Sequence, residues 1–158
     1  MRADEARTWE LLRALDDPDH VEFPAGFDRA SVTARFLRLE SQLGAAFGAC
    51  GSYRGEDASF HGCVEVAAAA TAGGRDINVM VSNFGDLAAV SFESFFFYED
   101  AEIAELMHPS DATRVYGALH DLGYVVVRLD PLWEYYDGVV ASLRSRADPW
   151  WSRYFDYL

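Results

Sequence analysis

Residues 60–66 read FHGCVEV and residues 77–82 read INVMVS, and these two stretches decide the predicted fold. In both, apolar side chains recur with a period of two, which is the period of a β-strand. Gly73 and Gly74 lie between the two stretches and can form the turn of a hairpin. The pattern therefore predicts two antiparallel strands that pair with each other.

A third strand is expected directly after this hairpin. The turn-forming residues 83–86, NFGD, lead into an apolar stretch at residues 87–97, in which every second residue from Ala88 to Phe92 would share one face. Together the strands make an antiparallel three-strand meander. Residues 124–129, YVVVRL, follow a helical segment and predict a fourth strand that pairs back onto the meander.

Helical patterns precede and follow the meander in the sequence. Residues 3–15 and 28–47 predict two N-terminal helices, while residues 99–107 and 110–122 predict a short acidic helix and a longer one before the fourth strand. A C-terminal helix is expected after Asp148, an N-cap that a proline follows. Its aromatic stripe consists of Trp150, Trp151, Tyr154, Phe155 and Leu158. Such a stripe predicts a C-terminus that is docked on the core.

These elements predict an α+β fold in a single globular domain that covers residues 1–158. We expect two layers, a sheet with the helices packed on one of its faces. The chain has 158 residues, of which 51% are hydrophobic, and this is enough for one core of ordinary size. No low-complexity linker and no repeat divides the sequence.

Charge and lysine content exclude several functional classes. The sequence has 13 arginines, 26 acidic residues and no lysine, which gives a formal net charge of -13. Nucleic acid and anionic membranes would repel such a chain, so neither is expected as a partner. A Schiff-base lysine and a P-loop lysine are excluded by absence. The first residues enter acidic helical sequence rather than an apolar leader, which favours a cytoplasmic protein.

Four polar residues around the first strand invite a catalytic interpretation. Ser59, His61, Cys63 and Glu65 occupy alternate positions, so they are expected on one face, and they include a thiol nucleophile, a base and an acid. Residues two apart on a strand stand about 7 Å apart, which is too far for the hydrogen bond between a cysteine and its histidine. We therefore interpret the four as polar, solvent-facing positions of a one-sided sheet.

The remaining motifs predict no catalytic residue, no metal ligand and no cofactor. Glu105 and His108 have the Glu-x-x-His spacing of di-metal helical bundles, but the second copy that such a bundle needs is missing. Glycine-rich phosphate loops and the Gly-x-Ser-x-Gly elbow are also missing. Cys50 and Cys63 lack a Cys-x-x-Cys spacing and are expected to be free thiols.

The acidic stretch at residues 99–137 is the strongest functional candidate in the sequence. It holds nine acidic residues against two arginines, which is -7 of the net charge of -13. Aromatic side chains are interleaved with the acids, and such a surface suits a basic protein partner, because charge speeds the encounter and aromatic contacts supply affinity. The candidate partner-binding residues are Glu99, Asp100, Glu102, Glu105, Trp133, Glu134, Tyr135, Tyr136 and Asp137. The alternative interpretation is that the acids maintain solubility while the aromatic residues belong to the core.

Several segments carry a resemblance to known proteins. With SNFGDLA at residues 82–88, GYVV at 123–126, YDG at 136–138 and WWSRYFDYL at 150–158, the chain resembles small uncharacterised proteins of high-GC actinobacteria. That resemblance implies no particular activity. In size, acidity and α+β layout the chain is similar to the immunity proteins that accompany bacterial polymorphic toxins. This similarity implies a non-enzymatic protein that inhibits a basic toxin.

Two functional hypotheses follow. The first is a non-enzymatic, acidic protein-binding domain, of which an immunity-type inhibitor of a basic bacterial toxin is the specific form. It predicts that acids and exposed tyrosines gather on one face. The alternative is an uncharacterised enzyme or small-ligand-binding domain with a pocket at the sheet. It predicts that His61, Cys63, His108 or His120 converge in a concave pocket.

Overall fold

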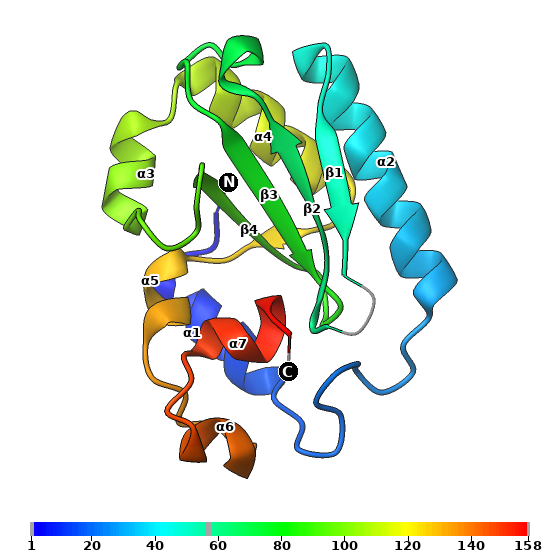
Figure 1. Cartoon of the computed structure of the whole chain (residues 1–158), viewed down its shortest axis with the longest axis vertical. Helices are drawn as coiled ribbons and strands as arrows, with labels where there is room; N and C mark the ends of the chain where they lie inside the picture. Colours follow the sequence, from blue (N-terminus) through cyan, green and yellow to red (C-terminus); the bar gives the residue numbers. More distant parts are fainter. Residues whose placement is uncertain (1, 56–57, 158) are drawn as a thin grey trace.

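The structure, a computed structural model, describes residues 2–55 and 58–157. It is an α+β fold built around one five-stranded sheet (Figure 1). The strands are β1 (Gly51–Arg54), β2 (Phe60–Val66), β3 (Ile77–Ser82), β4 (Leu87–Phe92) and β5 (Val125–Val126). The helices are α1 (Glu5–Ala14), α2 (Arg29–Phe47), α3 (Asp100–Leu106), α4 (Pro109–Asp121), α5 (Leu129–Trp133), α6 (Ala141–Ser145) and α7 (Trp150–Phe155), with a short 3₁₀ helix at Ala68–Ala70.

The predicted meander and the predicted helices are present. Strands β2, β3 and β4 pair antiparallel in chain order, with Val79 of β3 opposite Val64 on one side and Val90 on the other. The five helices expected from the sequence correspond to α1, α2, α3, α4 and α7. Leu158, expected at the end of the C-terminal aromatic stripe, lies outside the described residues. No helix within the described ranges has the length and apolar character needed to cross a membrane.

The sheet differs from the prediction at both of its edges. An additional strand, β1, lies in a glycine-rich stretch whose composition is typical of a loop, and it pairs with β2 so that Tyr53 lies opposite Cys63. At the other edge, β5 runs parallel to β4 and pairs through Val125 and Val126 only. The predicted strand at 124–129 is cut short because the chain turns into α5 at Leu129.

A β-bulge interrupts the alternation that was predicted for β2. The register between β2 and β3 shifts between Phe60 and Gly62, and this extra residue turns His61 toward α2, where its ring meets that of Phe36 edge-on at 5.4 Å. Gly62 permits this packing, because a Cβ there would stand 2.8 Å from the Phe36 ring. Cys63 pairs with Met80 on the opposite face. The prediction that His61 and Cys63 share one face is therefore wrong.

Helices cover both faces of the sheet, whereas the sequence predicts one covered face. On one side α2 packs against β2, and α4 packs against α2 and β5; on the other side α7 contacts β2 and β3 (Figure 1). Ser59 and Cys63 are fully buried and His61 is 2% exposed, so their interpretation as solvent-facing positions is wrong. Only Glu65 of that set is exposed, because α7 and its flanking residues leave this part of the second face open.

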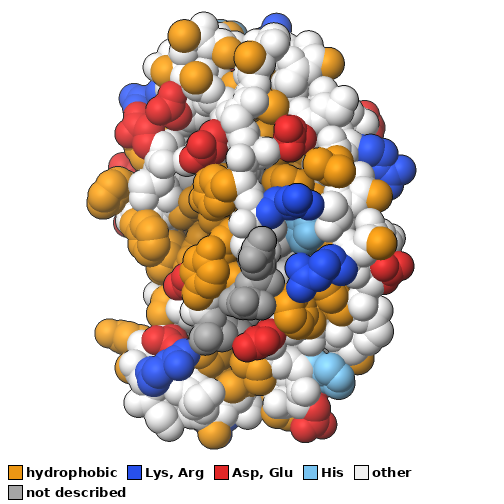
Figure 2. Space-filling model, turned by 45° about the vertical axis from the view of Figure 1, so that its right-hand side comes forward, with side chains coloured by type: hydrophobic (Ala, Val, Ile, Leu, Met, Phe, Trp, Pro, Cys, Tyr) orange, Lys and Arg blue, Asp and Glu red, His pale blue; other side chains and the backbone are white. Residues whose placement is uncertain are grey.

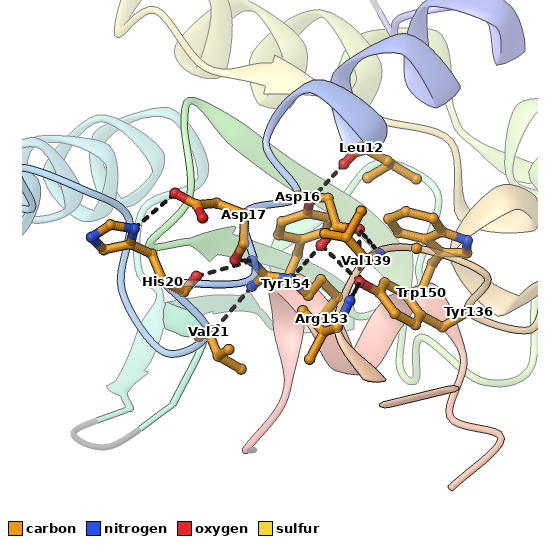
Figure 3. Close-up of polar contacts among 12 residues, drawn as sticks. Leu12, Asp16, Asp17, His20, Val21, Tyr136, Val139, Trp150, Arg153 and Tyr154 are labelled. Atoms are coloured by element: carbon orange, nitrogen blue, oxygen red, sulfur yellow. Dashed lines mark hydrogen bonds and ion pairs between the residues drawn. The ribbon is translucent and has the colours of Figure 1, made fainter. Parts of the chain in front are cut away.

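A buried ion pair holds α7 to the loop that follows α1 (Figure 3). The Arg153 Nε donates a hydrogen bond to Asp16 Oδ1 at 2.9 Å, and the two side chains are 0% and 3% exposed. The other two guanidinium nitrogens donate to the carbonyl oxygens of Asp17, His20 and Val21. Segments from the two ends of the sequence are thus joined inside the protein.

Asp16 also organises the chain before α6. The Tyr136 hydroxyl donates to the Asp16 carboxylate at 2.7 Å, and the Val139 amide donates to the same carboxylate at 2.9 Å (Figure 3). The Val140 amide in turn donates to the Tyr136 hydroxyl. Burial is the largest cause that raises the pKa of Tyr136, to about 12, and the hydrogen bond to Asp16 is the second. Tyr136 is therefore a neutral donor in the interior at physiological pH.

Candidate functional site

An acidic hollow with aromatic walls lies between α1 and the chain around α5. Its volume is about 390 Å³. It is lined by Glu5, Trp9, Arg13, Asp130, Pro131, Glu134, Tyr135 and Asp137. Four of these side chains are carboxylates and one is an arginine, so the lining has a formal net charge of -3. We call this feature the acidic hollow.

The start of α1 supplies one wall of the acidic hollow. Asp4 caps this helix by accepting a hydrogen bond from the Arg7 amide, which places Glu5 in the first turn and Trp9 one turn later. The Trp9 ring meets the Trp150 ring edge-on at 5.9 Å, so its position is set by the core beneath it. The tryptophan is partly buried and presents the remainder of its surface to the hollow.

The single arginine of the hollow is already engaged. Arg13 lies over the Trp9 ring at 5.3 Å and pairs with Asp137 at 3.2 Å. The hydrogen bond from Arg13 holds the pKa of Asp137 below its usual value, so this carboxylate is ionised and compensated. Within the described ranges no arginine pairs with Glu5, Asp130 or Glu134, so three carboxylates have no cationic partner.

The other wall brings in three of the residues that the sequence singles out. Glu134, Tyr135 and Asp137 line the acidic hollow, and the Tyr135 side chain is 77% exposed at its rim. A backbone bridge between Tyr135 and Pro149 holds this segment beside the start of α7. An aromatic ring beside uncompensated carboxylates is a suitable environment for a guanidinium or ammonium group, through ion pairing and cation–π contact.

Two predicted partner-binding residues belong to the interior. Asp100 is 2% exposed: its carboxylate accepts hydrogen bonds from Arg2 at 2.6 Å and from the amides of Leu129 and Asp130, so it caps the start of α5. Tyr136 is 4% exposed and bound to Asp16, as described above. Both side chains are buried, so a partner could not touch them. Their polar atoms form hydrogen bonds within the protein.

Glu99, which caps α3, and Glu102 and Glu105 within it lie on the surface but outside the hollow. Glu99 and Glu102 form a capping box in which the Glu99 amide donates to the Glu102 carboxylate at 2.9 Å. Glu105 is exposed one turn later. Asp130 connects this helix with the hollow, because its carboxylate accepts a hydrogen bond from the amide of Asp100 at the start of α3. Glu99, Glu102 and Glu105 therefore extend the negative surface beyond the hollow.

A second hollow lies on the open part of the sheet, beside α7. Its volume is about 350 Å³, and we call it the aromatic groove. It is lined by Tyr53, Phe60, Glu65, Asn78, Met80, Glu93, Ser94, Phe95, Phe96, Trp151, Phe155, Asp156 and Tyr157. Figure 2 shows hydrophobic side chains gathered near the middle of this side of the molecule. Every charged residue in its lining is acidic.

Trp133 supports the aromatic groove from behind. Its ring stacks on Trp151 with centroids 5.0 Å apart and lies 4.8 Å from the Phe96 ring, while its Nε1 donates to the Phe95 carbonyl oxygen. Phe96 and Phe97 are 68% and 78% exposed. The sequence predicts strand through Phe97, but β4 ends at Phe92. The sequence signal for exposure is the run of three phenylalanines at 95–97, because three consecutive large side chains cannot all point into one core, and only Phe95 of the three is buried.

The predicted cluster of the enzyme hypothesis does not form. His61 packs toward α2 and Cys63 lies on the opposite face of β2. His108 is exposed at the start of α4, where its Nδ1 accepts a hydrogen bond from the Ser110 amide, and His120 is exposed at the end of that helix. Within residues 2–55 and 58–157, no group of three or more histidine, cysteine or acidic side chains is placed to hold a metal ion.

Cys63 is expected to be unreactive in the folded protein. Burial raises the pKa of its thiol to about 12, so almost none of it is thiolate at pH 8. N-ethylmaleimide at pH 8 should therefore modify the half-buried Cys50 first and reach Cys63 only in urea, as read by mass spectrometry of peptides. Modification of Cys63 as fast in buffer as in urea would contradict the closed packing around β2.

Protein-family models, curated proteins and solved structures were each compared with the chain, and none of them matches it.

Proposed function

We propose that the protein is a non-enzymatic binding domain for a basic protein, and that the acidic hollow receives an arginine or lysine side chain of that partner. The observation that carries this proposal is the combination in one hollow of three uncompensated carboxylates with Trp9 and the exposed Tyr135. Carboxylates attract the cation, and the two rings provide apolar contact for its aliphatic stem and π-faces for its charge.

The overall charge supports the same partner. A net charge of -13 repels acidic molecules and accelerates the encounter with a basic one, with the steering concentrated where acids outnumber arginines. The exposed aromatic side chains Phe96, Phe97 and Tyr135 are of the type that dominates binding energy at protein interfaces. An immunity-type inhibitor that covers a basic bacterial toxin is the specific form of this function that the similarity in size, acidity and layout implies.

Substitutions in the hollow should separate steering from contact. Replacing Glu5 and Glu134 with glutamine should slow association with the partner about tenfold at low salt, because steering depends on charge. Replacing Tyr135 with alanine should instead speed dissociation about thirtyfold, the effect of losing a contact worth about 2 kcal/mol. Both rates are read by surface plasmon resonance with a basic protein captured from the native host.

The matched control removes the same charge elsewhere. Glu22 and Asp121 are exposed and lie outside both hollows, so their replacement by glutamine and asparagine changes the net charge equally. This control should bind like the wild type within about threefold. If it loses as much association rate as the Glu5 and Glu134 variant, or if wild type and variant recover the same proteins in equal amounts, the acidic hollow is not the binding site.

A second candidate function rests on the aromatic groove. A small-ligand-binding domain needs an apolar pocket at the sheet, and this groove lies there with a volume within the range of ligand sites. A ligand bound in it would change the fluorescence of Trp151, and replacing Phe96 with alanine should weaken that change without affecting the capture of a basic protein. If the Phe96 variant loses capture and leaves small-molecule binding unaltered, the groove belongs to the protein interface instead.

A further inference from the structure

A small basic pocket opens between the start of α2 and the end of β1, away from the acidic hollow. Its volume is about 230 Å³, and it is lined by Arg29, Thr33, Arg54, Gly55 and His61. Basic and histidine side chains meet on the side of the molecule that Figure 2 shows. Two arginines and no described acid in one lining are unexpected in a protein with a net charge of -13.

His61 lines this pocket and carries an unpartnered ring nitrogen. Its Nδ1 lies 3.0 Å from Asn83 Oδ1, and the Asn83 amide nitrogen donates to the carbonyl oxygens of Ala58 and Phe60, which fixes the orientation of the amide. Nδ1 is therefore the donor, and Nε2 is the ring nitrogen left for a group bound in the pocket. The side chain is 2% exposed, and Nε2 has no hydrogen-bond partner among the described residues.

The surrounding structure holds His61 in this position. The bulge in β2 turns the ring toward α2, and the Gly55 amide donates to the His61 carbonyl oxygen at 3.0 Å. An unpartnered buried nitrogen costs free energy, and such groups are rare unless they serve a ligand or another function. The position is thus maintained at a cost that a bound anion would remove once Nε2 gains a proton.

Neither arginine of the pocket forms an ion pair with an acid of residues 2–55 or 58–157. The Arg29 guanidinium lies over the Phe23 and Phe27 rings, at 5.2 Å and 5.6 Å from their centroids. Arg54 forms no ion pair with any described acid. Both side chains belong to exposed residues at the mouth of the pocket. Two guanidinium groups supply planar, paired donors that match the oxygens of phosphate and sulfate.

We propose that this pocket binds a phosphate-class oxyanion, with Arg29 and Arg54 at the mouth and the protonated His61 ring as the buried donor through Nε2. The 19-residue helix α2 begins at Arg29 and adds the positive end of its dipole. Two fixed positive charges, and a third on protonated His61, match a dianion better than a monoanionic carboxylate. The site goes beyond the proposed function, because it takes an anion whereas the acidic hollow takes a cation.

Anion binding at this site is coupled to a proton. Burial lowers the pKa of His61, the hydrogen bond to Asn83 raises it, and the charges of Arg54, Arg29 and Arg35 lower it again. The Phe36 ring that packs against it carries no charge. The empty site therefore holds a neutral ring at neutral pH, while a bound dianion favours the imidazolium. The affinity for the anion rises as the pH falls.

Isothermal titration calorimetry with inorganic phosphate and with sulfate, at constant ionic strength in chloride, tests the site. The wild type should show saturable binding at one site. Replacing Arg54 with glutamine should weaken it about tenfold or more, because one charge-assisted contact is lost. Replacing Arg38 with glutamine is the control, since this exposed arginine of α2 lies outside the pocket. Absence of saturable binding in the wild type, or equal weakening in both variants, overturns the proposal.

Two further measurements test whether His61 takes up the proton and which anion the site prefers. Sulfate stays a dianion between pH 6 and pH 8, so its affinity should rise toward pH 6 in the wild type and stay flat in a folded His61→Gln variant. A pH dependence that survives this substitution overturns the role of His61, and the Arg54 variant tests the site where the His61 variant fails to fold. Glycerol 3-phosphate binding more tightly than inorganic phosphate indicates a phosphorylated small molecule, the reverse indicates free phosphate, and tighter binding of acetate overturns the phosphate class.

Discussion

Replacing Arg153 with methionine is expected to lower the free energy of unfolding by about 3–5 kcal/mol, the usual cost of breaking a buried ion pair by removing one partner. The substitution leaves the Asp16 carboxylate, 3% exposed, without its cation. It also removes the donors to the carbonyl oxygens of Asp17, His20 and Val21. A domain of this kind has a total stability of about 5–15 kcal/mol, so the loss is a large part of it. Urea denaturation followed by tryptophan fluorescence measures the change.

An exposed ion pair provides the control for this experiment. A guanidinium nitrogen of Arg7 lies 2.7 Å from the Glu10 Oε2, and the two side chains are 53% and 66% exposed. Replacing Arg7 with methionine should change the stability by less than about 1 kcal/mol, because solvent and salt screen such a pair. If Arg153→Met lowers the free energy of unfolding no more than Arg7→Met does, the interior tolerates an Asp16 carboxylate without its cation, contrary to the structure.

Ending the chain at Ala147 is expected to abolish the cooperative folded state. This truncation removes four large aromatic side chains that are 0–3% exposed, Trp150, Trp151, Tyr154 and Phe155. Loss of a buried aromatic side chain costs about 3–5 kcal/mol, so four such losses exceed the stability of the whole domain. The part of β2 and β3 that α7 covers would be exposed as well. Near-ultraviolet circular dichroism and thermal unfolding should show loss of fixed packing.

The control for the truncation is the loss of an aromatic side chain that lies on the surface. Tyr157 is 62% exposed, so Tyr157→Ala should melt cooperatively near the temperature of the full-length protein. The truncated chain should also lose the hydrogen bonds that Ser59 and Ser82 donate to the backbone carbonyls of Asp156 and Tyr154. Cooperative melting of the truncated chain at the full-length temperature would mean that α7 is an appendage and that the sheet is stable without it.

Local sequence predicts much of the secondary structure because its causes are local. Helix α2 is predicted within one residue at its start, since Asp28 caps it by accepting from the Ser31 amide. It stops at Gly48, whose φ of +91° is accessible to glycine without strain. The strands β2 and β3 follow from the alternation of side chains. None of these features depends on what packs against the element from elsewhere in the chain.

The candidate sites required the tertiary structure. Glu134, Tyr135 and Asp137 are predictable as acidic and aromatic residues in one stretch, but Glu5 and Trp9, which complete the hollow, are more than 120 positions away in the sequence. No local pattern pairs such segments. Nothing in the residue types distinguishes the buried Asp100 from the exposed Glu99 beside it, because the difference lies in Arg2 and in the start of α5.

By itself the sequence determined five helices, α1, α2, α3, α4 and α7, together with the meander, the excess negative charge and the absence of any lysine chemistry. The tertiary structure alone decided which faces are covered, which acids are compensated and where His61 points. Alternation predicts His61 beside Cys63, and one extra residue in the register of β2 places them on opposite faces. The physical reason is that periodicity and capping are properties of neighbouring residues, whereas burial, charge pairing and strand register depend on segments that only folding brings together.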